Sequence, residues 1–341
     1  MERKLASIQI VTALELIEGA DRIVKATVMG WNVVVKKDEF RIGDKCVFFE
    51  IDAILPDGSE WAEFMRPKKF RVKTCKLRGV LSQGLAMPLS ILPELADPEV
   101  GADVTELLKV GKYEPPQHDG GAKFGKARGN FPHFVPKTDE IRLQSAIDLL
   151  EEIRNAGPFY ISVKMDGTSG TFCYDGDEFC ACSRNWKKTE DDTNVYWHVA
   201  RKYKLHEVLD HENKIYAIQG EVVGPGIQGN KPKLLELDLF VFNIYDIREG
   251  RLLGFEDFTA FCAGNGLKTV PIERIIRGKD LVTFDWSLEA WLKKAEGKYE
   301  GTDSPREGIV IRPLVSAYSP TLRGRLSFKV INNDFLIKYG E

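Results

Sequence analysis

The sequence predicts an α+β protein with two domains joined by a linker. The first 115 residues of the 341-residue chain carry short β-branched and aromatic runs separated by Gly, Asp and Pro, which is typical of an all-β domain. From Phe159 onward, apolar strand patterns mix with helical ones without strict alternation, which argues against a doubly wound parallel sheet. We expect an all-β barrel over 1–115, a linker over 116–136, and antiparallel sheets flanked by helices over 137–341.

In the N-terminal domain, the predicted strands are the runs KLASIQIV, KATVMGWNVVVKK and KCVFFEIDAIL. Short strands at this spacing favour an OB-like barrel, with an SH3-like barrel as the alternative. The following segment, Tyr113–Pro136, is rich in Pro, Gly and basic residues, as linkers are.

The C-terminal domain should begin with a helix over Thr138–Asn155, capped by Thr138. Arg142 would lie in its first turn, either as a surface charge or directed at a phosphate. Further helices are predicted at 193–210, 255–265 and 287–296. Strands are predicted at 159–163, 171–175, 178–183, 215–223, 238–247, 307–312 and 325–331.

Composition indicates an ordinary globular protein, with a formal net charge of −3 and 43% hydrophobic residues. No apolar run approaches the roughly 18 residues of a membrane-spanning helix, and the first ten residues lack a signal-peptide pattern. The six cysteines lack metal-type C-x-x-C spacing, which favours reduced packing cysteines. We expect a cytoplasmic monomer with no membrane partner.

The segment from Arg66 to Arg78, RPKKFRVKTCKLR, concentrates seven basic residues and no acid. If Phe70–Cys75 is a strand, alternation places three basic side chains on one face, Lys69, Arg71 and Lys73. Two interpretations remain open. The strand is a solvated edge protected by its charges, or it lines a groove that follows nucleic-acid phosphates.

The stretch FYISVKMDGTSG, residues 159–170, places Lys164 where a predicted strand meets a turn. A lysine amine attacks as a nucleophile only when neutral, so its pKa must be lowered by burial or by nearby positive charge. Gly167 would let a phosphate approach the backbone. Lys-x-Asp-Gly alone is a weak signal, and taken by itself it favours an exposed β-turn, because turn chemistry favours Asp-Gly.

Several charged residues interrupt apolar strand patterns further along the chain, among them Glu221, Glu307 and Lys329. A buried charge is costly unless it is paired or binds a metal. Each could form a structural ion pair. Together with Lys164 they describe a pocket with a nucleophile, carboxylates for a divalent cation, and cations for phosphate.

The order of these segments resembles the covalent nucleotidyltransferase superfamily of polynucleotide ligases and capping enzymes. VKMDG looks like motif I, CSRNW like Ia, QGEVVG like III, FNIYDI like IIIa, REGIVI like IV and SFKVIN like V, across roughly 137–333. The segments GDKCVFFEID, LRGVLSQGL and KTDEIRLQ resemble the ATP-dependent RNA ligases that place an OB domain first (RNA ligase family 5).

The resemblance implies that Lys164 becomes joined to AMP from ATP, with Mg²⁺ or Mn²⁺, and that RNA ends are then sealed. It implies metal-binding or ribose-binding roles for Asp166, Glu221 and Glu307, and an α-phosphate contact for Lys329. Arg184 would contact ribose or phosphate. Phe242 would stack on adenine opposite Val310, with Phe240 and Tyr245 as fallback rings. Ordinary core packing is the alternative for Phe242. A nick in an RNA duplex or in an RNA/DNA hybrid is the expected substrate.

One departure concerns motif V, where the family pattern Lys-x-Lys reads Ser327-Phe328-Lys329. On a continuous strand Arg325 shares their face, so either Arg325 supplies part of the missing charge or Lys329 suffices. Two rival functions remain. A DNA ligase or a GTP-using capping enzyme would carry an OB module after motif V, which we do not expect here. A non-enzymatic RNA-binding protein would not need the intact charged set.

Overall fold

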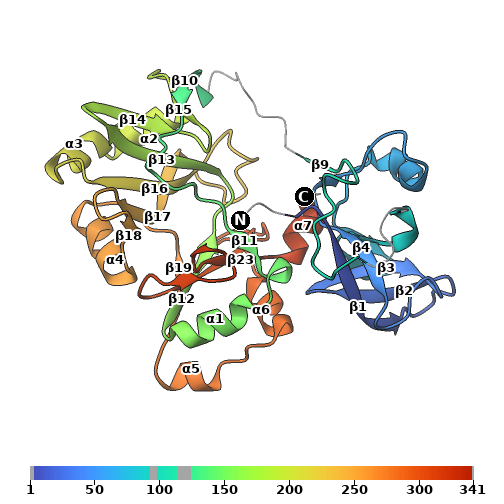
Figure 1. Ribbon diagram of the computed structural model, residues 1–341. Helices are drawn as coiled ribbons and strands as arrows, with labels where there is room; N and C mark the ends of the chain where they lie inside the picture. The colour runs from blue at the N-terminus through green and yellow to red at the C-terminus, as the bar shows by residue number, and fades with distance from the viewer. Residues whose placement is uncertain (1–3, 93–97, 114–123, 340–341) are drawn as a thin grey trace. The chain divides into compact units, whose positions relative to one another are not determined.

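The computed structural model describes residues 4–92, 98–113 and 124–339, which form two compact units (Figure 1). The first unit comprises the described part of residues 1–117 together with 143–147 and 334–339. The second unit comprises the described part of 118–142 together with 148–333. Each unit is described by itself.

The first unit is built on a five-stranded antiparallel sheet of order β3-β2-β1-β4-β8. The first half of β1 pairs with β4 and the second half with β2, with an irregularity between Val11 and Ala13. Such an interruption bends a strand and lets one sheet curl. The strands are β1 (Ala6–Leu16), β2 (Ile23–Val28), β3 (Trp31–Lys36), β4 (Lys45–Phe49) and β8 (Leu85–Pro88).

Smaller elements complete this unit, and apolar clusters pack against both faces of its sheet. Ile8, Val47 and Phe49 belong to one cluster, whereas Trp31 and Phe48 belong to the other. The smaller elements are β5 (Ala53–Ile54), η1 (Glu60–Lys68), β6 (Cys75–Leu77), β7 (Val80–Ser82), η2 (Leu89–Ile91), β9 (Gly111–Lys112) and α7 (Asn333–Tyr339).

The basic segment does not form the predicted strand over Phe70–Cys75. Lys69 and Phe70 adopt left-handed backbone angles, with φ of 51° and 56°, because they terminate the 3-10 helix η1. The strand that follows starts only at Cys75. The prediction that Lys69, Arg71 and Lys73 share one strand face is therefore wrong. Arg71 pairs with Asp52 at 2.7 Å.

The second unit contains two larger sheets (Figure 1). One has the order β10-β15-β14-β13-β16-β17-β18 and is antiparallel. Its strands are β10 (Ala127–Asn130), β13 (Thr168–Asp175), β14 (Glu178–Cys182), β15 (Trp186–Lys188), β16 (Tyr216–Val223), β17 (Asp238–Asp246) and β18 (Arg251–Leu252). Because β10 falls within the expected linker 116–136, part of that segment extends this sheet.

The other sheet has the order β11-β23-β20-β12-β19. Its pairs are antiparallel except β11 with β23, which run parallel. Its strands are β11 (Ile141–Arg142), β12 (Phe159–Lys164), β19 (Ile272–Ile276), β20 (Gly308–Pro313) and β23 (Phe328–Ile331), and a separate hairpin joins β21 (Tyr318–Ser319) to β22 (Gly324–Arg325).

The predicted helix over Thr138–Asn155 is wrong in its first half. Residues 141–142 instead pair with β23, and Thr138 bonds Ser169 at 2.9 Å rather than capping a helix. The predicted helix 193–210 divides at Lys204, whose φ is 49°. The observed helices are α1 (Leu149–Ala156), α2 (Val195–Lys202), α3 (Leu205–His211), α4 (Phe255–Gly264), α5 (Lys279–Thr283) and α6 (Leu288–Ala295), with η4 at Leu143–Ser145 in the first unit.

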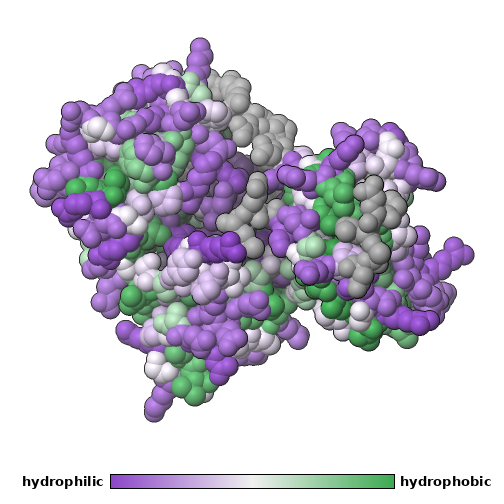
Figure 2. Space-filling view, in the orientation of Figure 1, coloured by the Kyte–Doolittle hydropathy of each residue, from purple (hydrophilic) through white to green (hydrophobic). Residues whose placement is uncertain are grey.

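Figure 2 shows hydrophilic residues over most of the viewed face of the second unit, with smaller hydrophobic areas between them. Within the described residues, no helix combines the length and the apolar character needed to cross a membrane.

We predict that Gly308→Ala destabilises the second unit severely. Gly308 has a φ of 155°, and an added Cβ would lie 2.2 Å from the Val330 carbonyl oxygen. Strain of about 1–3 kcal/mol adds to this clash, so the free energy of unfolding should fall by about 3 kcal/mol or more.

Gly176→Ala is the matched control, because its φ is also positive, at 63°, but no atom lies within 4 Å of the added Cβ. It should cost only about 1–2 kcal/mol. Urea unfolding of both variants measures the difference, and equal losses would contradict the close-approach argument.

Candidate active site

Strand register places the predicted site residues of the β11-β23-β20-β12-β19 sheet in one neighbourhood. Lys164 pairs with Gly308, and Ser162 pairs with Val310. Val310 in turn pairs with Lys329, which pairs with Arg142 on β11. Because side chains alternate along a strand, Ser162 and Lys164 share one face of β12. The sheet thus brings together residues that are far apart in the sequence, such as Arg142 and Lys329, which are separated by 187 positions.

Lys164 is held by Glu307, with 2.6 Å between Nζ and Oε2. Burial favours the neutral amine, but the negative charges of Glu307 and Glu221 outweigh burial and raise the pKa of Lys164. The lowered pKa that a nucleophilic amine needs is therefore not supplied by the protein alone. Deprotonating Lys164 requires positive charge that offsets these carboxylates.

The other two predicted carboxylates also lie near Lys164, Asp166 being buried and Glu221 partly buried. Asp166 pairs with Lys231 at 2.6 Å, and each side chain is only 9% exposed. Burial raises the pKa of Glu221 to about 8, against the opposing attraction of Lys164. Gly167 has a structural role here, because an added Cβ would lie 2.4 Å from the Val222 carbonyl oxygen.

Two further cations complete this charged group. Burial, together with the positive charges of Lys164 and Arg142, lowers the pKa of Lys329 to about 7. Because the charges of Lys164 and Arg142 act on Lys329, these cations lie within electrostatic reach of Lys329. Such a cluster suits an anionic ligand that carries several negative charges, such as a polyphosphate.

The three carboxylates are not arranged as a ready-made metal site. Within the described part of the chain, no group of three His, Cys, Asp or Glu side chains could hold a metal ion. Lysines satisfy two of the acids instead, Asp166 and Glu307. The donor chemistry nevertheless fits Mg²⁺ or Mn²⁺, since hard cations prefer oxygen ligands and Mg²⁺ usually retains several waters.

Phe242 belongs to β17 and is only partly buried. It packs with Phe240 against an apolar group that contains Met165, the residue after Lys164. Val310, on β20, is 7% exposed. The two proposed base-binding side chains thus come from different sheets. Tyr245 packs in a separate cluster.

Arg184 lies at the surface, where it pairs with Asp139 at 2.7 Å and is 51% exposed. Lys69, Arg71 and Lys73 belong to the first unit. The guanidinium of Arg71 lies 3.4 Å from the centre of the Tyr113 ring as well as contacting Asp52. Arg71 is therefore engaged within its own unit.

Arg325 does not share a strand with Lys329. Residues 326–327 separate β22 from β23, so the premise of one continuous strand face is wrong. The Arg325 guanidinium instead contacts Glu140 and donates to Asn243 Oδ1 at 2.9 Å. The Arg325 guanidinium therefore binds the buried Glu140 carboxylate and the Asn243 side-chain amide.

Comparisons with known proteins place this geometry in a family. The RNA ligase family profile matches residues 157–331, which is more than half of the chain. The chain belongs to the RNA ligase family. An OB-fold domain profile matches residues 5–89. No curated protein sequence gives a match.

Solved structures of Naegleria gruberi RNA ligase resemble this family member along nearly its whole length. A mutant with AMP and Mn is 36% identical with a TM-score of 0.86, and each chain is covered to 98%. A mutant with ATP and Mn gives 35%, 0.87 and the same coverage. A structure with pyrophosphate gives 35%, 0.85 and 98% of each chain. The predicted α+β fold with an OB domain first is confirmed.

Two residues of this RNA ligase that support the site carry no sequence signal. The Tyr299 hydroxyl donates to the Lys164 carbonyl and accepts from the Glu307 amide, both at 3.2 Å. It thereby joins the backbone of the two paired residues. Lys231 lies in a Pro- and Gly-containing loop that resembles an ordinary turn. Only the fold places these side chains beside the motifs.

We predict that Tyr299→Phe lowers the free energy of unfolding by about 1–3 kcal/mol, because a buried amide and a carbonyl each lose a partner. Urea denaturation measures the loss. Tyr318→Phe, at an exposed position, is the control and should change stability by less than about 0.5 kcal/mol. Similar losses in both variants would show that the hydrogen bonds of the Tyr299 hydroxyl do not contribute measurably to the free energy of unfolding.

Proposed function

We propose that this RNA ligase joins 3′-hydroxyl and 5′-phosphate RNA ends by using ATP and a covalent lysyl-AMP intermediate. The observation that carries the proposal is Lys164 at the end of β12, paired with Glu307 and surrounded by further acids and cations. The Naegleria gruberi enzyme has been solved with ATP, AMP, Mn and pyrophosphate, which supports the same nucleotide and metal here.

The reaction proceeds through three phosphoryl transfers. The neutral Lys164 amine attacks the α-phosphorus of ATP, forming a P–N bond as the bond to pyrophosphate breaks. A 5′-phosphate oxygen of RNA then attacks the same phosphorus, which frees the amine and forms an RNA adenylate. A 3′-hydroxyl finally attacks the 5′-phosphorus, closing the phosphodiester and releasing AMP. Charge neutralisation and alignment dominate such steps.

Asp166, Glu221 and Glu307 would hold the divalent cation, directly or through its waters, or contact ribose hydroxyls. These carboxylates would let Mg²⁺ or Mn²⁺ neutralise charge on the reacting phosphate and offset the negative charge that keeps Lys164 protonated. While Glu307 pairs with Lys164, it favours the protonated amine. Lys231 likewise pairs with Asp166, one of the acids proposed to hold the cation.

Lys329 and Arg142 would contact the phosphates, since their positive charges lie near Lys164. Phe242 would stack on adenine, with Val310 on the opposite side. Arg184 would reach ribose or phosphate from its surface position once it leaves Asp139. Gly167 allows the close strand approach that aligns Glu221 with Lys164.

We further infer that the substrate is a nick in an RNA duplex or an RNA/DNA hybrid, that the enzyme acts as a monomer, and that it works in the cytoplasm. Family resemblance supports the nick. The six cysteines are all free thiols, five of them buried, which suits a reducing compartment.

Incubation with α-labelled ATP and Mg²⁺, followed by denaturing electrophoresis and mass analysis, tests the proposal. Wild-type protein should gain one AMP at Lys164, and pyrophosphate should discharge it. Lys164→Ala should form no adduct yet still seal a pre-adenylated nick, because that substrate bypasses the first step. Lys298→Ala, which alters an exposed lysine, is the control. Labelling by GTP alone would favour the capping reaction, and ATP-dependent sealing by Lys164→Ala would refute the assignment.

The basic segment of the OB domain supports a second prediction, that it contacts RNA phosphates. Replacing Lys69 and Lys73 by Ala should reduce the slope of log binding constant against log salt by about 2, because each phosphate contact contributes roughly 0.9 on a duplex. Arg71→Ala should change this slope less, since Arg71 is already bound to Asp52. Titration of nicked duplex RNA at several salt concentrations measures the slope. An unchanged slope in the double-lysine variant would remove this segment from the RNA interface.

A further inference from the structure

We propose that Glu140, Arg312 and Arg325 form a positioning network that fixes the base-binding end of the nucleotide pocket and so makes ATP binding depend on the adenine base. None of the three is proposed to touch the reacting phosphates. The inference rests on the proposed function, because it assigns these residues to the pocket that would hold the AMP moiety.

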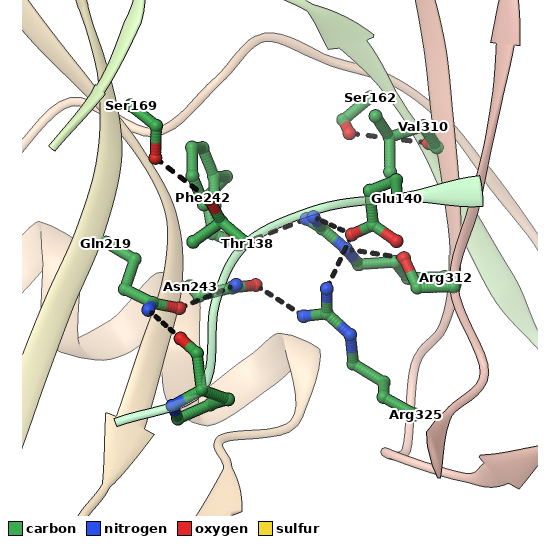
Figure 3. A network of polar contacts seen from close by, with 12 residues as sticks. Thr138, Glu140, Ser162, Ser169, Gln219, Phe242, Asn243, Val310, Arg312 and Arg325 are labelled. Atoms are coloured by element: carbon green, nitrogen blue, oxygen red, sulfur yellow. Dashed lines mark hydrogen bonds and ion pairs between the residues drawn. The ribbon is translucent and has the colours of Figure 1, made fainter. Parts of the chain in front are cut away.

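One buried carboxylate organises the network (Figure 3). Glu140 accepts from Arg312 at 2.9 Å and also from Arg325. The side chains of Glu140 and Arg312 are each only 8% exposed. Burial would raise the pKa of Glu140, but the charges of Arg325 and Arg312 outweigh burial and keep that pKa below its usual range. Glu140 is therefore the anion that lets two guanidinium groups share one buried space.

Arg312 connects this carboxylate to both walls of the proposed base pocket. It lies two residues after Val310 on β20. Its Nη1 donates to the carbonyl oxygen of Phe242 at 3.1 Å, and its Nε donates to Ser327 Oγ at 3.1 Å. One side chain thus ties the backbone that carries the proposed stacking ring to the strand that carries the opposing valine.

Arg325 extends the network to the seven-stranded sheet. It donates to Asn243 Oδ1, and Asn243 Nδ2 donates to Gln219 Oε1 at 3.0 Å. Gln219 Nε2 then donates to the Pro136 carbonyl at 2.8 Å (Figure 3). Asn243 follows Phe242, and Gln219 lies two residues before Glu221 on β16. The chain of hydrogen bonds therefore runs beside residues assigned to base and metal binding.

Packing alone does not fix Phe242 on the side that faces this network. A cavity of about 30 Å³ is lined there by Tyr160, Phe242, Asn243, Arg312 and Arg325, among others. On this side Arg312 contacts Phe242 twice, because it donates to the Phe242 carbonyl and its guanidinium carbon lies 5.8 Å from the centre of the ring. Loss of the network should displace the ring, and a displacement of about 1 Å can change binding or rate by about a hundredfold.

The test compares ATP with ribose 5-triphosphate, which has the same phosphates and no base. Glu140→Gln keeps the side-chain shape but removes the charge that the two arginines share. We expect its KM for ATP in lysyl-AMP formation to rise by about ten- to a hundredfold, with a smaller change in kcat. The inhibition constant of ribose 5-triphosphate should remain within about twofold of the wild-type value.

Arg325→Lys is the second variant, because an ammonium group keeps the charge but cannot bridge Asn243 and Glu140 as a guanidinium does. It should show the same base-specific loss in smaller degree, and it serves if Glu140→Gln fails to fold. Asp238→Asn is the matched control. Asp238 is a buried carboxylate that contacts Lys202 and Lys268 outside the network, and its substitution should affect both ligands equally or not at all.

The outcomes separate the two hypotheses. If wild-type protein forms no adduct with ATP at Lys164, the proposed function fails whatever the variants do. If wild-type protein is labelled but folded Glu140→Gln and Arg325→Lys bind ATP normally, the positioning network is refuted. It is equally refuted if ATP and ribose 5-triphosphate weaken by the same factor, since that result indicates a general structural defect.

Discussion

Ion pairs between largely enclosed side chains dominate the centre of the second unit of this RNA ligase. Lys164 and Glu307 face each other at 2.6 Å, and Lys231 and Asp166 do the same. Each ion pair satisfies a group that would otherwise be costly to bury. The same contacts favour the protonated form of the amine proposed as nucleophile, and they occupy two of the acids proposed to hold metal. In the protein alone, these ion pairs therefore engage both lysines and two of the three acids.

The backbone makes these pairings possible by bringing strands unusually close. Gly167 lies against the Val222 carbonyl, and Gly308 against the Val330 carbonyl. Both close approaches lie next to a charged member of the site. Val222, which Gly167 contacts, follows Glu221, and Gly308 itself follows Glu307. A side chain at either glycine would push a strand away and separate the charges. The glycines of motifs I and IV are thus explained by strand packing, and a phosphate-binding role is not required to account for them.

The local sequence pattern was sufficient to predict an element where that element is amphipathic or apolar along its own length. The strands around Lys164, Glu221 and Glu307 were predicted nearly to the residue, because alternation and apolar runs reflect burial directly. It failed where tertiary pairing decides. Residues 141–142 have a helical pattern but pair with β23, and left-handed angles at Lys69 and Phe70 break an apparent strand. Glu140 and Arg325 meet across 185 positions, a distance over which no local pattern carries information.

The departure in motif V is consistent with the buried network. Ser327 stands where the family pattern has its first lysine, and it is 2% exposed. Its hydroxyl accepts from Arg312, which already shares Glu140 with Arg325. A lysine at position 327 would bring a third positive charge to a single buried carboxylate, and like charges at low dielectric repel strongly. A neutral hydroxyl is compatible with two arginines there. Arg325 is thus engaged with Glu140 and Asn243, whereas Lys329 is the motif V cation within electrostatic reach of Lys164.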